Sequence, residues 1–253
     1  MKHIVTETKD RVFRIEIARA DKKNALTLDM YAALADALAA AAADPAVRVA
    51  LVHGTRDCFT AGNDLKDFLD RPPHTEDAPT WWFLRALPRF GKPLVAAVNG
   101  AAVGIGTTML LHCDFVYAAP GARFQMPFVP LGLVPEAGSS FLFPFVAGYQ
   151  RAAELLLGQP FTVDKAYEAG FVTQIVPEAE LFERARGGAL AVAALPPAAV
   201  RATRALMRMH TRKRVKEAMD EEGKVFTERL ASPEAREAMT AFFEKRKPDF
   251  SRF

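Results

Sequence analysis

The sequence predicts an α/β fold with largely parallel strand pairing, followed by a helical C-terminal region. Short hydrophobic segments typical of buried strands alternate with helical segments as far as about residue 152, and the pattern is mostly helical afterwards. The chain has 253 residues, half of them hydrophobic, which is enough to bury a large core. We therefore expect an α/β core that contains the functional site over residues 1–194 and a helical region over 195–253.

The first part of the chain predicts a hairpin, a helix and a buried strand. Apolar and polar residues alternate in HIVTET and RVFRIEIAR, on either side of Lys9-Asp10, which indicates an opening β-hairpin. Thr27 is placed to cap a helix over 28–43, a run rich in Ala and Leu that ends before Asp44-Pro45. VRVALVHG then reads as a buried strand, and the prolines and mixed charges of 71–79 predict a mobile loop.

The middle of the chain repeats this strand and helix pattern. TWWFLRALPRF predicts a helix, PLVAAV a strand, VGIGTTMLLHC a helix that begins at glycines, and DFVYAA and ARFQM two short strands. No charge occurs from Leu94 to Leu111, but the glycines, threonines and Asn99 in this stretch favour a buried strand, turn and helix over a membrane span. Further on, FVTQIV predicts a strand, and Ser232-Pro233-Glu234 the start of the last helix.

Charge and cysteine content restrict the class of protein. The formal net charge of +3 is too small to indicate a nucleic-acid or membrane partner. Cys58 and Cys113 fit neither a disulfide framework nor a spaced metal site, and the five histidines show no metal-binding spacing, so we expect no metal. The first 20 residues carry charges throughout and lack the apolar block of a signal peptide, which predicts a cytoplasmic protein.

One acidic residue stands out in the segment VPLGLVPEAGSSFLFP. Glu136 is the only charged residue between Arg123 and Arg151, and its neighbours are Phe, Leu, Val and Pro. A lone carboxylate in such a run is either a loop residue that faces water or a group held in a dry pocket for proton transfer. The residues around it leave both interpretations open.

Three segments carry a family resemblance when they are read together: CFTAGNDLKDF at 58–68, AAVNGAAVGIGTTMLLHCDFVYA at 96–118 and FQMPFVPLGLVPEAGSS at 124–140. With RADKKNALT near the start and ERLASPEAREAMTAFFEKRKPDF near the end, they resemble the crotonase superfamily, the enoyl-CoA hydratase/isomerase family. The resemblance covers nearly the whole chain. It implies a crotonase-like spiral of ββα repeats with a C-terminal helical trimerisation region, and a homotrimer or dimer of trimers.

The resemblance also implies an acyl-CoA thioester substrate, with coenzyme A as part of the substrate and no separate cofactor. Glycines such as Gly62, Gly104 and Gly106 let the backbone approach a ligand and turn N–H groups toward it. In the family, one N–H of the AGxD turn and one of the glycine turn hold the thioester oxygen. By position these are the N–H groups of Asn63 and Ile105. The family usually has three consecutive glycines where this chain has Gly-Ile-Gly.

The same resemblance suggests which residues contact the substrate. The AGNDLK turn is expected to meet the adenine end of coenzyme A. The paired lysines at 22 and 23 either meet its phosphates or form a solvated turn. The predicted substrate-binding residues are Lys22, Lys23, Ala61, Gly62, Asp64, Leu65, Gly104, Thr108 and Phe128.

The acidic residues decide which reaction the resemblance favours. Typical enoyl-CoA hydratases carry two glutamates at the positions that Thr108 and Phe128 occupy here, and neither of these side chains exchanges a proton usefully. Glu136 lies at the position in PEAGSS where peroxisomal-type Δ3,Δ2-enoyl-CoA isomerases carry their catalytic glutamate. The resemblance therefore implies an isomerase in which Glu136 moves the double bond from the 3,4 to the 2,3 position.

Two alternatives remain open at this stage. The first is an enoyl-CoA hydratase in which Glu136 activates water by itself. The second is a nucleic-acid-binding protein that uses the basic segment RATRALMRMHTRKRVK at 201–216. Because Val200, Leu206 and Met207 mix apolar residues into this segment, we favour a solvated or subunit-facing helix and expect no nucleic-acid partner.

Overall fold

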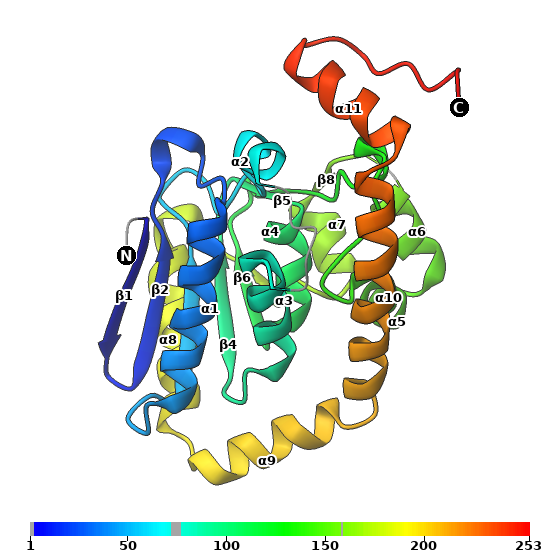
Figure 1. Ribbon diagram of the computed structural model, residues 1–253. Helices are drawn as coiled ribbons and strands as arrows, with labels where there is room; N and C mark the ends of the chain where they lie inside the picture. Colours follow the sequence, from blue (N-terminus) through cyan, green and yellow to red (C-terminus); the bar gives the residue numbers. More distant parts are fainter. Residues whose placement is uncertain (1–2, 72–76, 158) are drawn as a thin grey trace.

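The computed structural model describes residues 3–71, 77–157 and 159–253, which form a mixed α/β fold (Figure 1). Within these residues the main sheet has six strands in the order β1-β2-β3-β4-β6-β9, and a small second sheet has the order β5-β7-β8. The strands are β1 (Ile4–Lys9), β2 (Val12–Ile17), β3 (Val49–His53), β4 (Leu94–Val98), β5 (Ala101–Val103), β6 (Phe115–Ala118), β7 (Arg123–Gln125), β8 (Phe161–Thr162) and β9 (Gln174–Ile175).

Helices cover both faces of the main sheet and form the C-terminal region. They are α1 (Leu28–Ala43), α2 (Leu65–Asp70), α3 (Pro79–Arg89), α4 (Ile105–Thr108), α5 (Ser139–Ala147), α6 (Tyr149–Leu157), α7 (Val163–Glu168), α8 (Leu181–Ala194), α9 (Pro197–Arg208), α10 (Arg212–Leu230) and α11 (Pro233–Phe243). Short 3-10 helices lie at Ala20–Lys22, Met109–His112, Val129–Leu131 and Glu178–Glu180.

The predicted hairpin and parallel strands are confirmed. β1 and β2 pair antiparallel, and the pairs from β2 to β9 across the main sheet are all parallel. Alternate residues of β3 face two different cores, because Ala50 and Val52 join the cluster with α1 and α3 while Val49 and Leu51 pack under α8. Strands buried on both faces read as nearly continuous apolar runs, which is why VRVALVHG and PLVAAV were recognisable in the sequence.

Local signals fixed several element boundaries but not all of them. α1 begins at Leu28, and the Thr27 hydroxyl accepts a hydrogen bond of 3.3 Å from the Met30 N–H, as its position predicts. The helix expected at VGIGTTMLLHC is only four residues of α-helix, Ile105–Thr108, and continues as a 3-10 helix. The pattern did not predict β8. The loop expected at 71–79 falls largely on 72–76, outside the described residues.

The helical C-terminal region expected over 195–253 is present as α9, α10 and α11. Figure 1 shows α9 leading from the end of α8 to α10, after which α11 lies beyond the other end of α10. Arg204 on the basic segment is buried. Its Nε donates to Asp114 at 2.8 Å and its Nη1 to the Phe90 carbonyl at 2.6 Å. Part of the basic segment therefore docks α9 against the α/β core, and trimerisation through this region stays a prediction.

Across the described ranges, none of the helices has both the length and the apolar character needed to cross a membrane. The apolar stretch from Leu94 to Leu111 instead forms β4, β5, α4 and part of a 3-10 helix. Their buried side chains belong to the cores on the two faces of the main sheet. The sequence-based interpretation of this stretch as buried strand, turn and helix is confirmed.

Candidate active site

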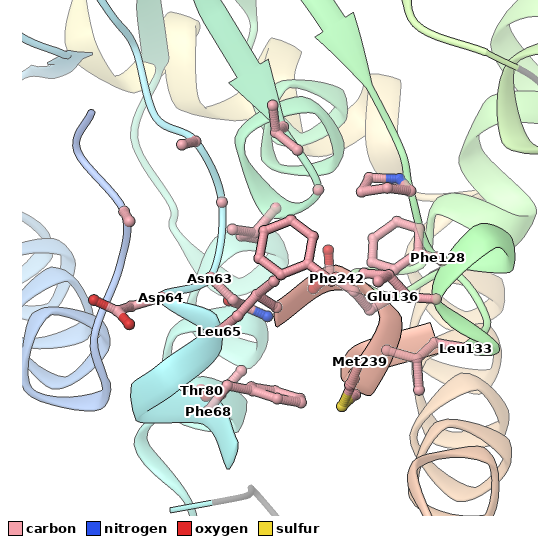
Figure 2. Close-up of a pocket in the computed structure, with 18 of the residues that line it drawn as sticks. Asn63, Asp64, Leu65, Phe68, Thr80, Phe128, Leu133, Glu136, Met239 and Phe242 are labelled. Carbon is pink, nitrogen blue, oxygen red and sulfur yellow. The ribbon is translucent and has the colours of Figure 1, made fainter. Parts of the chain in front are cut away.

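A pocket of about 620 Å³ lies between the glycine turns of the core and the C-terminal helices. Its size is within the range of small-molecule sites. The apolar part of its wall includes Phe68, Trp81, Phe128, Leu133, Met239 and Phe242. Figure 2 shows Asn63 and Leu65 on one side of this pocket and Glu136 and Phe128 on the other. The lining also includes residues of α10 and α11, so the site extends beyond the core residues 1–194.

Two backbone N–H groups in this pocket are available to a ligand. Among the described residues, neither the Asn63 N–H nor the Ile105 N–H donates to another protein group. Asn63 follows Gly62, whose φ of +83° requires glycine, and Ile105 is the first residue of α4, where helix N–H groups have no partner within the helix. Both residues line the pocket. The pair has the composition of an oxyanion hole for a thioester carbonyl.

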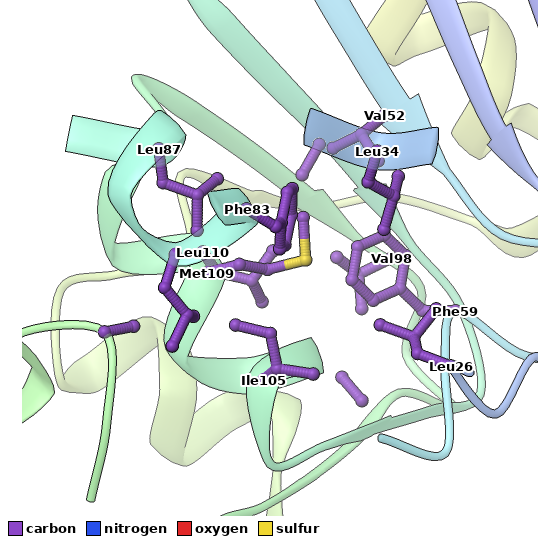
Figure 3. Packing of buried hydrophobic residues seen from close by; sticks show 14 of the residues in the cluster. Leu26, Leu34, Val52, Phe59, Phe83, Leu87, Val98, Ile105, Met109 and Leu110 are labelled. Atoms are coloured by element: carbon purple, nitrogen blue, oxygen red, sulfur yellow. The ribbon is translucent and has the colours of Figure 1, made fainter. Parts of the chain in front are cut away.

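Isoleucine at position 105 fits because its side chain is accommodated in the hydrophobic core. Ile105 is buried, and Figure 3 shows its side chain packed among core residues such as Phe83 and Met109. The preceding residue, Gly104, has a φ of +56° and the next, Gly106, lies so close to Thr60 that a Cβ would come within 2.6 Å of the threonine Cγ2. Gly104 is therefore required by its backbone conformation and Gly106 by its packing against Thr60, whereas the middle position accepts a side chain.

Glu136 is buried at the wall of the pocket. Its Oε1 accepts a hydrogen bond of 2.5 Å from the Thr108 hydroxyl. Burial raises the pKa of Glu136 to about 8, while the Thr108 hydrogen bond opposes this shift and the nearby Glu222 adds to it. Once it has lost its proton, a carboxylate with such a pKa is a much stronger base than an ordinary glutamate. The dry-pocket alternative for Glu136 is therefore the one that the structure supports.

Among the described lining residues the only other carboxylate is that of Asp64, and it already accepts hydrogen bonds from the protein. It accepts a hydrogen bond of 2.7 Å from Arg19 Nη1 and caps α2 by accepting from the Asp67 N–H. These hydrogen bonds keep its pKa below the ordinary value, although partial burial acts in the opposite direction. Figure 2 shows the Asp64 carboxylate directed away from the pocket. Asp64 therefore has a structural role at the rim of the pocket.

Most of the predicted site residues lie around this pocket. The lining includes Asn63, Ile105, Glu136, Lys22, Ala61, Gly62, Asp64, Leu65, Gly104 and Phe128. Lys23 and Thr108 are outside the lining. The Lys23 side chain is exposed, and its carbonyl accepts from the Ala61 N–H at 2.9 Å. Thr108 is fully buried behind Glu136 and reaches the site only through its hydroxyl. The part that each residue has in binding or catalysis stays a prediction.

Four features of the site escaped the sequence analysis. Tyr31 of α1 lines the pocket, and its hydroxyl donates to the Asn63 side-chain oxygen. Lys66 also lines the pocket. The α11 residues that close one side could not be assigned, because nothing in their sequence indicates where α11 packs. Glu222 of α10 is a second buried acid, next to the turn that carries Glu136 but not in the pocket lining.

No cluster of three or more His, Cys, Asp or Glu side chains suited to a metal ion occurs in the part of the chain that the structure describes. Cys58 and Cys113 are both free, and burial raises the pKa of each thiol. His112 is buried with its pKa lowered to about 4, so it is neutral near pH 7. The ionisable group poised for chemistry in the pocket is Glu136.

Comparison with known proteins places the chain in a family. A family model described as enoyl-CoA hydratase/isomerase matches residues 7–252. The chain is 34% identical over 248 residues to the peroxisomal enoyl-CoA delta isomerase 3 of Mus musculus, covering 95% of this chain and 78% of that protein. It is 31% identical over 254 residues to the 2,3-dehydroadipyl-CoA hydratase of Escherichia coli, with 99% of each chain covered.

A solved structure gives the same result for the fold. The enoyl-CoA hydratase/isomerase from Pseudoalteromonas atlantica T6c superimposes with a TM-score of 0.94 at 41% sequence identity, covering 99% of this chain and 100% of that one. The relatives named above include both isomerases and hydratases, so family membership leaves the individual reaction open. On the family match, the identity and the shared fold together, the chain belongs to the enoyl-CoA hydratase/isomerase family.

Proposed function

We propose that this enzyme is an enoyl-CoA isomerase that shifts the 3,4 double bond of an enoyl-CoA to the 2,3 position with Glu136 as its only acid-base group. The observation that supports the proposal is that only one carboxyl group in the described pocket lining is available for proton transfer. Of the two acids in the described pocket lining, Asp64 is held by Arg19, and Glu136 is buried with a raised pKa. One such group is sufficient for a proton shift between two carbons of the same substrate.

The reaction then proceeds in two proton transfers. Deprotonated Glu136 takes a proton from C2, the C2–H electron pair enters the conjugated system, and the thioester oxygen becomes the anionic end of a dienolate. The N–H groups of Asn63 and Ile105 stabilise that oxygen, with each donor of this kind contributing about 2.7–4 kcal/mol. Protonated Glu136 returns the proton at C4, and the double bond ends between C2 and C3. No water enters the balance.

The apolar wall of the pocket suits this chemistry. By the family resemblance, Phe128 occupies the position of one hydratase glutamate, and here it contributes an aromatic surface to the pocket instead of a second acid. Hydration must deliver a water to one carbon and a proton to its neighbour, which two positioned carboxyl groups do best. The second candidate is nevertheless a hydratase in which Glu136 acts alone, because the chain resembles the Escherichia coli hydratase over its full length.

A panel of coenzyme A thioesters separates the two candidates. Purified enzyme is incubated with 3-enoyl-CoA and with 2-enoyl-CoA substrates of several chain lengths, and the products are identified by mass spectrometry. We expect 3-enoyl-CoA to give 2-enoyl-CoA of unchanged mass, with no 3-hydroxyacyl-CoA accumulating. Rapid addition of water to 2-enoyl-CoA without isomerisation of 3-enoyl-CoA would make the enzyme a hydratase and contradict the proposal.

The pH dependence gives a second expected result. Because only the ionised form of Glu136 accepts a proton and its pKa is about 8, kcat/KM should increase with pH and level off above about pH 8. Thr108→Val keeps the shape of the side chain but removes the hydroxyl whose hydrogen bond lowers the pKa of Glu136. We therefore expect this variant to shift the profile to higher pH. A wild-type profile that is flat from about pH 6 to pH 9 would rule out Glu136 as the titrating base.

A further inference from the structure

The buried acid Glu222 has no part in the proposed proton transfer, yet it contacts the turn that carries Glu136. Its Oε2 accepts from the Gly138 N–H at 2.6 Å and its Oε1 accepts from the Ser140 N–H at 2.8 Å. Both oxygens of the carboxylate therefore accept hydrogen bonds from backbone N–H groups that closely follow Glu136 in the chain. Glu222 is not among the residues that line the pocket, so it lies behind the pocket wall.

The turn at residues 136–140 needs such support because its backbone is strained. Ala137 has a φ of +62° and Gly138 a φ of +72°, and a non-glycine residue in this region costs about 1–3 kcal/mol unless its surroundings hold it. The buried, neutral His112 donates from Nε2 to the Ala137 carbonyl at 2.7 Å. The Ser139 hydroxyl donates to the Glu136 carbonyl at 2.6 Å. Glu222 accepts the hydrogen bonds of the Gly138 and Ser140 N–H groups in the same turn.

Helix α10 also packs tightly against this turn. A Cβ at position 138 would lie 3.1 Å from Val215 Cγ1 and 3.3 Å from Met219 Cγ, two side chains of α10. The two carboxylate hydrogen bonds thus join the C-terminal helical region to the backbone of the proposed base. A movement of α10 would move this turn as well, and with it the Glu136 carboxylate.

We propose that Glu222 is a positioning residue for the reaction: its carboxylate holds the turn of residues 136–140 through the Gly138 and Ser140 N–H groups, and its negative charge acts on Glu136. The inference rests on Glu136 as the base of the proposed function. It assigns to the C-terminal region a role in catalysis as well as in closing the pocket.

The electrostatic part of this role follows from the groups around Glu136. Tyr31 of α1 is neutral, because burial raises its pKa well above the usual value, and His112 is neutral because burial lowers its pKa to about 4. Among the described residues, Glu222 is the charged group that acts on Glu136. Burial raises the pKa of Glu222 to about 7, while its hydrogen bonds from Ser140 and Gly138 favour the ionised form. Its charge then makes Glu136 a stronger base.

Three variants on α10 test the proposal. Glu222→Gln removes the charge and presents an amide N–H₂ to one of the two backbone donors. Glu222→Asp keeps the charge but shortens the side chain by one methylene. Glu221→Gln is the matched control, because Glu221 is the exposed neighbour on the same helix and its ion pair among the described residues is with Lys224 at 2.6 Å. Circular dichroism and melting temperature report whether each protein is folded.

Two measurements are made on each protein. The first is kcat and KM as functions of pH with the thioester that the wild type converts, whether by isomerisation or by hydration. The second is an infrared titration of the buried carboxyl groups in substrate-free enzyme, in which the Glu136 band is identified by its loss in Glu136→Gln. The infrared result does not depend on the reaction, so a wrong isomerase assignment and a wrong role for Glu222 are distinguishable.

We expect Glu222→Gln to lower kcat about 10²-fold with KM within about threefold of the wild type, and to shift the Glu136 titration to lower pH. Glu222→Asp should also lower kcat but leave the titration near its wild-type midpoint, and Glu221→Gln should match the wild type in both. A Glu222→Gln enzyme with wild-type kcat and an unmoved Glu136 midpoint would overturn the proposal. If Glu222→Gln does not fold, wild-type kcat in Glu222→Asp would overturn the positioning role.

Discussion

Glu136→Gln is expected to lower the turnover of 3-enoyl-CoA by about 10³–10⁴-fold while the protein remains folded. A positioned general base contributes about 10²–10⁴-fold, and here one group serves both proton transfers, so the loss should be at the upper end. The amide has the shape of the protonated carboxyl group, which is the form that predominates below pH 8. Steady-state kinetics with 3-enoyl-CoA and binding of a coenzyme A thioester measure the two effects separately.

The same variant has an expected effect on stability. The pKa of Glu136 is raised from 4.5 to about 8 by folding, so the folded state binds more protons than the unfolded state between these values. The free energy of unfolding of the wild type therefore decreases as pH rises through about 8. Glutamine at position 136 does not titrate, so Glu136→Gln shows no such decrease from this position. We expect the melting temperature of the variant, relative to that of the wild type, to increase between about pH 5 and pH 9. If the difference in melting temperature does not increase over this pH range, folding does not raise the pKa of Glu136.

Two control substitutions sharpen the kinetic result. Thr108→Ala and Phe128→Ala should alter the rate or the chain-length preference but leave isomerisation detectable, because neither side chain transfers a proton. If Glu136→Gln retains more than about a tenth of wild-type turnover, the loss is smaller than even a weak general base would cause. Glu136 would then not be the base, and the isomerase assignment would fall with it.

Gly62→Ala is expected to lower kcat by about 10²–10³-fold, the effect of losing one oxyanion donor. Gly62 has a φ of +83°, and a Cβ at this position would lie 2.7 Å from the Val103 carbonyl oxygen. Backbone must therefore shift, and the segment that shifts carries the Asn63 N–H. Because the donor acts mainly on the charge that develops during the reaction, kcat should change more than KM. The measurement is the kinetics of 3-enoyl-CoA isomerisation.

Gly121→Ala is the matched control for this substitution. A Cβ at position 121 meets no atom within 4 Å, and Gly121 is not among the glycines with positive φ. It should leave kcat unchanged. A Gly62→Ala enzyme that is folded and works at a rate close to that of Gly121→Ala would show that the Asn63 N–H does not stabilise the developing oxyanion.

The fold and most of the pocket were predictable because their determinants are local in sequence. Buried parallel strands require continuous apolar runs, α1 requires a capping residue such as Thr27, and the turn before Asn63 requires a glycine at position 62. Glu136 was conspicuous for a similar reason, since a charge within an apolar segment is visible without knowledge of the fold. The family resemblance of these segments then assigned the proposed base and both backbone donors before any contact was known.

The surroundings of Glu136 depended on tertiary structure. In the sequence it is isolated, but folding places Glu222 against its turn from 84 residues beyond Gly138. The α11 residues in the pocket wall and the raised pKa of Glu136 depend in the same way on how α10 and α11 pack. Burial and charge coupling are sums over neighbours in space, and helix periodicity shows which face is apolar without showing what it covers. The sequence by itself therefore determined the fold, the glycine turns and the proposed base, and only the packing of distant helices decided the environment that makes this carboxyl group basic.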